Sequence, residues 1–283
     1  MARARNNSIQ KLISSKGMML WIPVHMSDVS YSLSPSDIDI HACDDSQLFP
    51  LGTKLEFADG RLFRYCRASS GGIGYTARLV ANGYFDPGGS TYADTNGFAG
   101  YVYSAITAGD TEVNIADTTV RDQDYYAGGI FSYSPAGGQY ITHRIVGSDK
   151  GNGSYVKLYL EDACRSALAT SSRETRSYPS KWGNVIGGLT TQQWKSFICV
   201  NQVAVTASYW FWGQTRGECH LVNYGDGANI IGGTINYREV WGMVTDGSVC
   251  SYSSTPTGYQ RIGYCLPCTE SAYGTCLVQL QLE

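Results

Sequence analysis

The sequence has few charged residues and no long apolar run. Charged residues make up 16% of the 283 positions, compared with about 25% in a typical globular domain. The net charge is −3, and the longest basic cluster is the short stretch from Arg3 to Arg5, so the charge pattern argues against nucleic-acid binding. The apolar run from Met18 to Val24 is too short for a membrane span or a signal-peptide core. We therefore expect synthesis in a reducing cytoplasm and no membrane partner.

Motifs of nucleotide-binding and nucleophilic enzymes are also missing. There is no dinucleotide fingerprint, and the Gly-rich stretches 69–74 and 82–100 lack the lysine and the helix of a phosphate loop. Nucleophilic catalysis needs a base beside the nucleophile. Cys219 and His220 are sequence neighbours, so on a strand they should face opposite ways. The other histidines have no recognisable partner in the sequence; they are His25, His41 and His143.

Acidic residues form no clear catalytic pair. A glycosidase needs two carboxyl groups on either side of its substrate. The adjacent pairs Asp44–Asp45 and Glu161–Asp162 are expected in turns or at the start of a helix instead. We predict no catalytic residue, no cofactor and no metal, and hence a protein that is not an enzyme, with a hydrolase on a β scaffold as the weakest alternative.

Nine cysteines, an odd number, are scattered from Cys43 to Cys276. Cys265 and Cys268 form a C-x-x-C motif, which can supply two of the four ligands of a structural zinc ion. Cys250 and Cys276 lie nearby in sequence, but the second C-x-x-C pair of a typical zinc site is missing. Zinc binding, a disulfide and plain buried thiols are the three alternatives, and we favour buried thiols.

Glycine and tyrosine, in contrast, are abundant, with 33 and 21 residues. Runs of aromatic and β-branched residues recur between turn signals at a spacing of about 8–12 residues, which predicts an all-β fold of sandwich-like or barrel-like modules. We expect the Gly-rich residues 69–100 to form long loops with little strand. The segment Glu161 to Thr170 is the one stretch that resembles a helix.

Four consecutive aromatic residues, Tyr209 to Trp212, are the most distinctive feature of the chain. Because side chains alternate along a strand, Tyr209 and Phe211 should face one side, and Trp210 and Trp212 the other. We expect one face to pack inside its own domain and the other against a second layer or a neighbouring subunit. A platform for stacking on sugars is the alternative role for these rings.

The residues after the aromatic run suggest a hairpin. Gly213 should end the first strand, residues 214–217 should form the turn, and residues 219–222 the returning strand.

A second hairpin is predicted between residues 53 and 65, and the pattern also predicts which residues face each other across its two strands. If residues 58–60 form a three-residue loop with Gly60 in the left-handed region, Leu55 falls opposite Phe63 and Thr53 opposite Tyr65. A two-residue turn would place Leu55 opposite Arg64, which the hydrophobic pattern disfavours. Two further strands alternate clearly: Val156, Leu158 and Leu160 should share one face, as should Cys276, Val278, Leu280 and Leu282.

Three segments are expected along the chain. Residues 1–46 mix polar stretches with one apolar patch and suggest an extended N-terminal arm, although the patch at 18–24 is equally consistent with a first strand of the main domain. Residues 47–180 form a β domain with long loops, and Pro179 with the polar run 171–181 marks its end. Residues 181–283 form a C-terminal β domain.

Three parts of the chain carry a resemblance to a known family. They are residues 49–53 with 59–65, residues 197–200 with 209–217, and residues 261–265 with the terminal strand. The second part contains the motif W-x-Q-T-x-G at Trp212–Gly217. The three parts cover about half of the chain and consist mostly of strand and turn residues. They resemble structural proteins of tailed bacteriophages, especially the head decoration (cement) proteins.

The resemblance implies a role in the virion and no catalytic residue. It suggests a homotrimer, assembled in the host cytoplasm, that binds the major capsid protein and stabilises the head through protein–protein contacts. A receptor-binding or carbohydrate-binding module of a fibre or spike is the alternative function, with the loops at 69–100 as its contact region. The candidate interface residues are Trp21, Tyr209, Trp210, Phe211 and Trp212.

Overall fold

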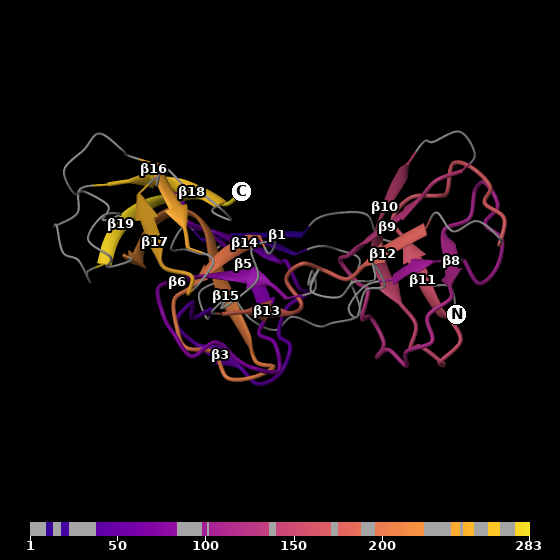
Figure 1. Cartoon of the computed structure of the whole chain (residues 1–283), viewed down its shortest axis with the longest axis horizontal. Coiled ribbons are helices and arrows are strands. Elements are labelled where there is room, and N and C mark those ends of the chain that lie inside the picture. The colour runs from indigo at the N-terminus through magenta and orange to yellow at the C-terminus, as the bar shows by residue number, and fades with distance from the viewer. Residues whose placement is uncertain are drawn as a thin grey trace. The chain divides into compact units, whose positions relative to one another are not determined.

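The computed structural model describes most of the chain, and all regular structure in the described residues is β (Figure 1). The described residues contain no helix, and hence none long and apolar enough to cross a membrane. The all-β prediction is therefore confirmed. The described ranges are 10–13, 18–22, 38–83, 98–100, 102–135, 140–170, 175–187, 196–223, 239–243, 246–251, 260–266 and 275–283.

The chain divides into two compact units. Among the described residues, 98–181 form the smaller unit and the remaining segments form the larger unit. The observed boundary after Lys181 lies one residue from the predicted one, but no boundary falls at residue 46. Residues 47–83 belong instead with the C-terminal half, because the strand Leu62–Arg67 pairs with the strand Trp210–Val222.

The larger unit is built on an antiparallel sheet whose main path runs β1-β2-β4-β5-β15-β19-β18-β16-β17. Strands β3, β6, β13 and β14 extend it off this path. The strands are β1 (Gln10–Ile13), β2 (Met19–Ile22), β3 (Cys43–Asp44), β4 (Lys54–Glu56), β5 (Leu62–Arg67), β6 (Arg78–Asn82), β13 (Val185–Ile186), β14 (Phe197–Asn201), β15 (Trp210–Val222), β16 (Glu239–Gly242), β17 (Val249–Ser251), β18 (Gln260–Cys265) and β19 (Thr275–Gln281).

Strand β15 occupies the centre of this sheet and replaces the hairpin predicted for residues 209–222. Its first part pairs with β5, and its second part, from Arg216 onward, pairs with β19. The predicted turn at 214–217 is wrong, because these residues stay extended and find partners on both edges. What remains of the turn signal is a register shift between Gln214 and Arg216 and a φ of +91° at Gly217.

The predicted hairpin of β4 and β5 is confirmed, with Leu55 paired to Phe63. The Tyr65 N–H donates to the Thr53 carbonyl at 3.0 Å, which is the expected register. Gly60 has a φ of +88°, a left-handed conformation that glycine adopts without steric cost.

The described part of residues 1–46 belongs to the sheet. Strand β2 pairs with β1 on one side and with β4 on the other, and Leu20 is fully buried. For residues 19–22 the alternative of a strand in the main domain is therefore confirmed. Residues 1–9, 14–17 and 23–37 of the predicted arm lie outside the described residues.

The smaller unit contains a second antiparallel sheet in the order β7-β12-β9-β10-β11-β8. Its core includes the predicted apolar face of Val156, Leu158 and Leu160, all fully buried. The strands are β7 (Phe98–Gly100), β8 (Glu112–Ile115), β9 (Ile130–Tyr133), β10 (Ile141–Ser148), β11 (Val156–Leu160) and β12 (Thr175–Tyr178).

Two local predictions are wrong. Residues 161–170 form bends and a single bridge instead of a helix, because Leu168 exchanges both backbone hydrogen bonds with Ile106. In the stretch 69–100, expected to be nearly free of strand, β6 pairs with β13 and β14. Residues 79–82 of β6 are buried in the larger unit, so tertiary pairing decides their conformation.

Candidate functional site

The aromatic run at 209–212 contributes to the core of the larger unit. Tyr209 and Phe211 join one hydrophobic cluster and Trp210 and Trp212 another, which confirms the predicted alternation. Both faces are covered within the same unit. Phe211 and Trp212 are 0% and 2% exposed, so these two interface candidates present no surface to a partner or to a sugar.

The remaining interface candidates, Tyr209, Trp210 and Trp21, are half-buried, and the two tryptophans lie beside basic side chains. The Arg67 guanidinium lies over the Trp210 ring at 4.9 Å from its centroid, and Lys54 Nζ lies 5.2 Å from the Trp21 ring. Cation–π contacts of this kind hold long side chains against aromatic faces. Tyr209, Trp210 and Trp21 thus keep part of their surface accessible.

None of the cysteines that the structure describes forms a disulfide. Cys250 and Cys276 are buried, and Cys265 is half-buried with its Sγ 2.8 Å from the Leu266 carbonyl. Cys268 of the C-x-x-C motif lies outside the described residues. Within the ranges that the structure describes, no group of three or more His, Cys, Asp or Glu residues could hold a metal ion.

Cys219 and His220 point to opposite faces of β15, as predicted. Cys219 is 3% exposed, whereas His220 is exposed. Burial raises the pKa of the Cys219 thiol to about 12. A thiol with so high a pKa carries almost no thiolate at neutral pH and is a poor nucleophile.

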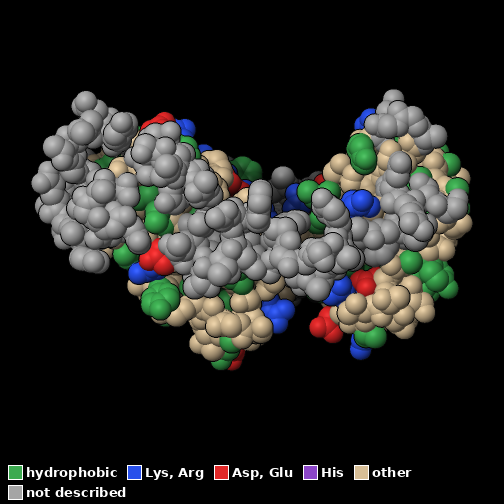
Figure 2. All heavy atoms as spheres, viewed as in Figure 1, with side chains coloured by type: hydrophobic (Ala, Val, Ile, Leu, Met, Phe, Trp, Pro, Cys, Tyr) green, Lys and Arg blue, Asp and Glu red, His purple; other side chains and the backbone are tan. Residues whose placement is uncertain are grey.

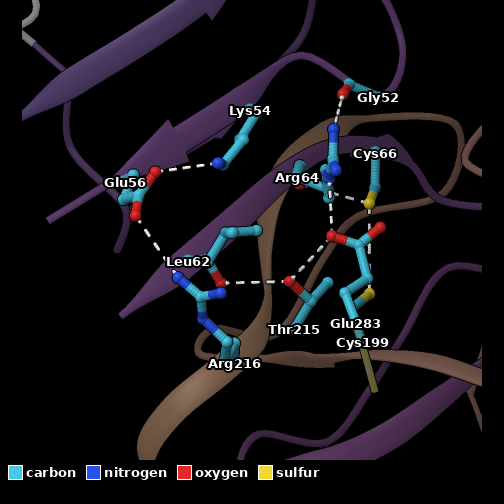
Figure 3. Close-up of polar contacts among 10 residues, drawn as sticks. All are labelled: Gly52, Lys54, Glu56, Leu62, Arg64, Cys66, Cys199, Thr215, Arg216 and Glu283. Carbon is cyan, nitrogen blue, oxygen red and sulfur yellow. Dashed lines mark hydrogen bonds and ion pairs between the residues drawn. The ribbon is translucent and has the colours of Figure 1, made fainter. Parts of the chain in front are cut away.

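A polar network surrounds the point where β15 passes from β5 to β19 (Figure 3). Arg64 donates from Nε to the Glu283 carboxylate and from Nη1 to the Gly52 carbonyl, both at 2.9 Å. The Thr215 hydroxyl donates to the Leu62 carbonyl at 3.3 Å. On the other side of the network, Glu56 is ion-paired with Lys54 at 2.8 Å and Arg216 at 3.3 Å.

This network joins backbone and side chains of neighbouring strands to one another. Each side chain in it already has a protein partner, as the dashed lines in Figure 3 show. Two thiols, Cys66 and Cys199, lie in the same region with their Sγ atoms 3.9 Å apart. The arrangement stabilises the point where β15 passes from β5 to β19. It offers no free side chain among those drawn for contact with a substrate.

The smaller unit contains a pocket of about 730 Å³ beside the start of β10. This volume lies within the range of about 300–1,000 Å³ that is usual for ligand sites. Strand β10 and the segment just before it supply one wall, and the bends after β11 supply the other. The polar and aromatic residues that line it are Tyr140, Thr142, His143, Asp162, Arg165 and Ser166.

His143 is the most deeply placed of these polar side chains. It is 5% exposed, stacks on Tyr133 with ring centroids 5.8 Å apart, and its Nε2 atom is buried without a hydrogen-bond partner. Burial lowers the pKa of His143 more than Asp162 raises it, and Arg165 lowers it further. The imidazole is therefore neutral at pH 7, and its Nε2 atom lies unpaired below the accessible surface.

Asp162 and Arg165 are exposed at the same pocket, and neither forms an ion pair or hydrogen bond with another described residue. Sequence reasoning missed this site. His143 had no recognisable partner because its neighbours come from a segment about 20 positions away. Glu161–Asp162 was expected in a turn or at the start of a helix, and it lies in a bend. The helix predicted for residues 161–170 gave no sign that this bend lies beside β10.

Comparison of the chain with models of known families, with curated protein sequences and with solved structures gave no match.

Proposed function

We propose that the chain is a structural protein of a tailed-bacteriophage virion, a head decoration (cement) subunit that binds the major capsid protein. The observation that carries this proposal is an all-β chain with few charges and exposed apolar side chains on both units. In Figure 2, charged side chains are scattered over the described part of the visible face, among apolar side chains and the tan atoms of other side chains and the backbone. The exposed large apolar residues are Tyr75, Tyr103, Val120, Ile130, Tyr140 and Tyr264.

The physical function would be to add buried interface to the head. Interfaces are enriched in tyrosine and depleted of lysine and acidic residues, so a surface of this composition suits permanent contact between proteins. In a homotrimer, each subunit would bury part of its exposed apolar area against the other two subunits and part against the shell. The buried area would then oppose outward pressure on the head.

Two measurements on the full-length protein test the proposal. Light scattering after size exclusion should give the mass of a trimer, and the protein should sediment with empty shells of the major capsid protein encoded by the same genome. A monomer at high concentration that does not bind these shells would overturn the proposal.

A charge scan would locate the contact face. Each exposed apolar residue named above is replaced singly by Asp, with the exposed Thr118→Asp as the matched control. We expect at least one replacement on each contact face to weaken shell binding or trimer formation roughly tenfold or more, because an unpaired charge is desolvated there. The control should bind as the parent does.

A further inference from the structure

We propose that the pocket formed by Tyr140, His143, Asp162 and Arg165 in the smaller unit binds a neutral sugar residue. This site is a function beyond capsid contact, and it does not depend on the proposed role in the head. Its supporting observations are the pocket of about 730 Å³, the unpartnered His143 nitrogen and the two unpaired charged side chains.

The charged side chains that line the pocket give it no net charge. Asp162 and Arg165 have opposite signs, so the pocket favours neither an anion nor a cation, and a neutral polar ligand does not have to desolvate a charge of its own. Each of the two side chains can engage hydroxyl groups, because a carboxylate accepts hydrogen bonds and a guanidinium donates them. A ligand with several adjacent hydroxyl groups satisfies both at once, which is the chemistry of a sugar.

His143 contributes to the wall of the pocket. Its Nε2 atom is buried without a partner, so a hydroxyl group of the ligand would relieve this unpaired atom only after a small side-chain shift that exposes it. Because the imidazole is neutral, it adds no charge to the site. The hydroxyl groups of Thr142 and Ser166 line the same pocket and extend its polar surface.

Tyr140 supplies an apolar contact at the rim. It is 74% exposed, which leaves its ring face accessible. An aromatic face packs well against the C–H groups of a sugar ring, while the phenol hydroxyl remains in water.

The site is suited to binding and not to hydrolysis. Among the residues that line the pocket, Asp162 alone carries a carboxylate. Glycoside hydrolysis typically uses two carboxyl groups on either side of the scissile bond. We therefore expect the bound sugar to be released unchanged.

The test uses the full-length protein labelled with ¹⁵N and a panel of methyl glycosides of glucose, galactose, mannose and N-acetylglucosamine. At least one should shift the amide signals of residues 140–143 and 162–166, with a dissociation constant in the roughly millimolar range expected for a single sugar. A glycan array would then identify the larger glycan that carries this residue.

Variants distinguish sugar binding in the pocket from sugar binding elsewhere on the protein. Tyr140→Ala and Asp162→Asn should each weaken binding roughly tenfold, since each removes one principal contact. Tyr75→Ala, in the larger unit, and the exposed Asp122→Asn, elsewhere in the smaller unit, are the matched controls and should bind as the parent does. Unchanged amide spectra away from the substitution would show that each variant is folded.

Three results would overturn the proposal. They are the absence of pocket shifts with every glycoside and on the array, sugar binding that survives both pocket variants, and shifts produced by glycine or acetate but by no sugar. Binding to capsid shells is measured separately, so failure of the sugar site would leave the proposed role in the head intact. Failure of that role would likewise leave this site intact.

Discussion

The two units differ in how the chain supplies their strands. The sheet of the smaller unit comes from one continuous stretch, residues 98–178. The sheet of the larger unit comes from both sides of that stretch, and its central strand β15 pairs with β5 from the first half of the chain and β19 from the last. Contacts far apart in sequence carry a larger loop-closure cost, so we expect the smaller unit to form first and independently.

Their buried polar groups differ as well. In the smaller unit, Asp117 accepts hydrogen bonds from Arg121 Nε at 3.0 Å and from the Tyr126 hydroxyl at 2.8 Å. In the larger unit, Gly213 is a crowded point of the central strand, between β5 and β14. A substitution at Asp117 should therefore act on the smaller unit, and one at Gly213 on the larger unit.

The largest effect is expected for Gly213→Val. A Cβ atom at this position would lie 2.8 Å from Cys199 Cβ and even closer to its Sγ, so the sheet must shift. We expect a loss of more than about 3 kcal/mol in the stability of the larger unit. Tryptophan fluorescence during urea unfolding measures this loss selectively, because no tryptophan lies between residues 87 and 181.

Gly74→Val is the matched control for this variant. A Cβ atom there meets nothing within 4 Å, so its stability should change little. Hydrogen exchange with mass spectrometry should show that Gly213→Val leaves the smaller unit protected. Simultaneous loss of protection in both units would show that they do not fold independently.

The next effect concerns the smaller unit alone. Asp117→Asn removes the negative charge that faces Arg121 and changes the acceptor for Tyr126, so we expect a loss of about 2 kcal/mol. The loss is measured by urea unfolding that is monitored by the hydrogen exchange of peptides within residues 98–181. Asp122→Asn, at an exposed position of the same unit, should leave stability unchanged. A loss confined to the larger unit would contradict the comparison.

A smaller effect on stability is expected from the protonation of His143. Burial lowers its pKa in the folded state below the ordinary value of 6.5, so the unfolded chain binds a proton more readily than the folded unit. Stability of the smaller unit should therefore fall as pH decreases below about 6.5, with a slope of at most about 1.4 kcal/mol per pH unit from this group. His143→Gln should flatten the curve; an unchanged curve would contradict the assignment.

The smallest effect is chemical and leaves stability unchanged. Burial raises the pKa of Cys219 to about 12 and that of Cys164 to about 11, so both units should protect their buried thiols from alkylation at pH 8. Peptide mass spectrometry should find the half-buried Cys265 labelled first. Labelling of Cys219 or Cys164 at the rate of Cys265 would show that the unit concerned opens easily.

Local patterns predicted much of the fold. The three-residue loop ending at Gly60 and the register of Leu55 against Phe63 follow from one turn residue and the apolar pattern. The alternation of Tyr209 to Trp212 between two faces follows from strand geometry alone. None of these features needs information about a distant partner.

The candidate pocket could not be predicted in this way. His143 lies on β10, and Asp162 and Arg165 lie in bends that the sequence suggested were helical. Their proximity depends on the bridge between Leu168 and Ile106, a contact across about 60 positions.

The sequence alone determined the β character of this protein, the alternation of its strands and the position of the turn at residues 58–60, because these depend on residues adjacent in the chain. The tertiary structure decided that residues 213–217 continue a strand instead of turning. Extended backbone needs partners for its N–H and C=O groups, and β5, β14 and β19, which lie far from these residues or beyond a loop in the sequence, supply them. It likewise decided which histidine lies beside an unpaired acid and an unpaired base.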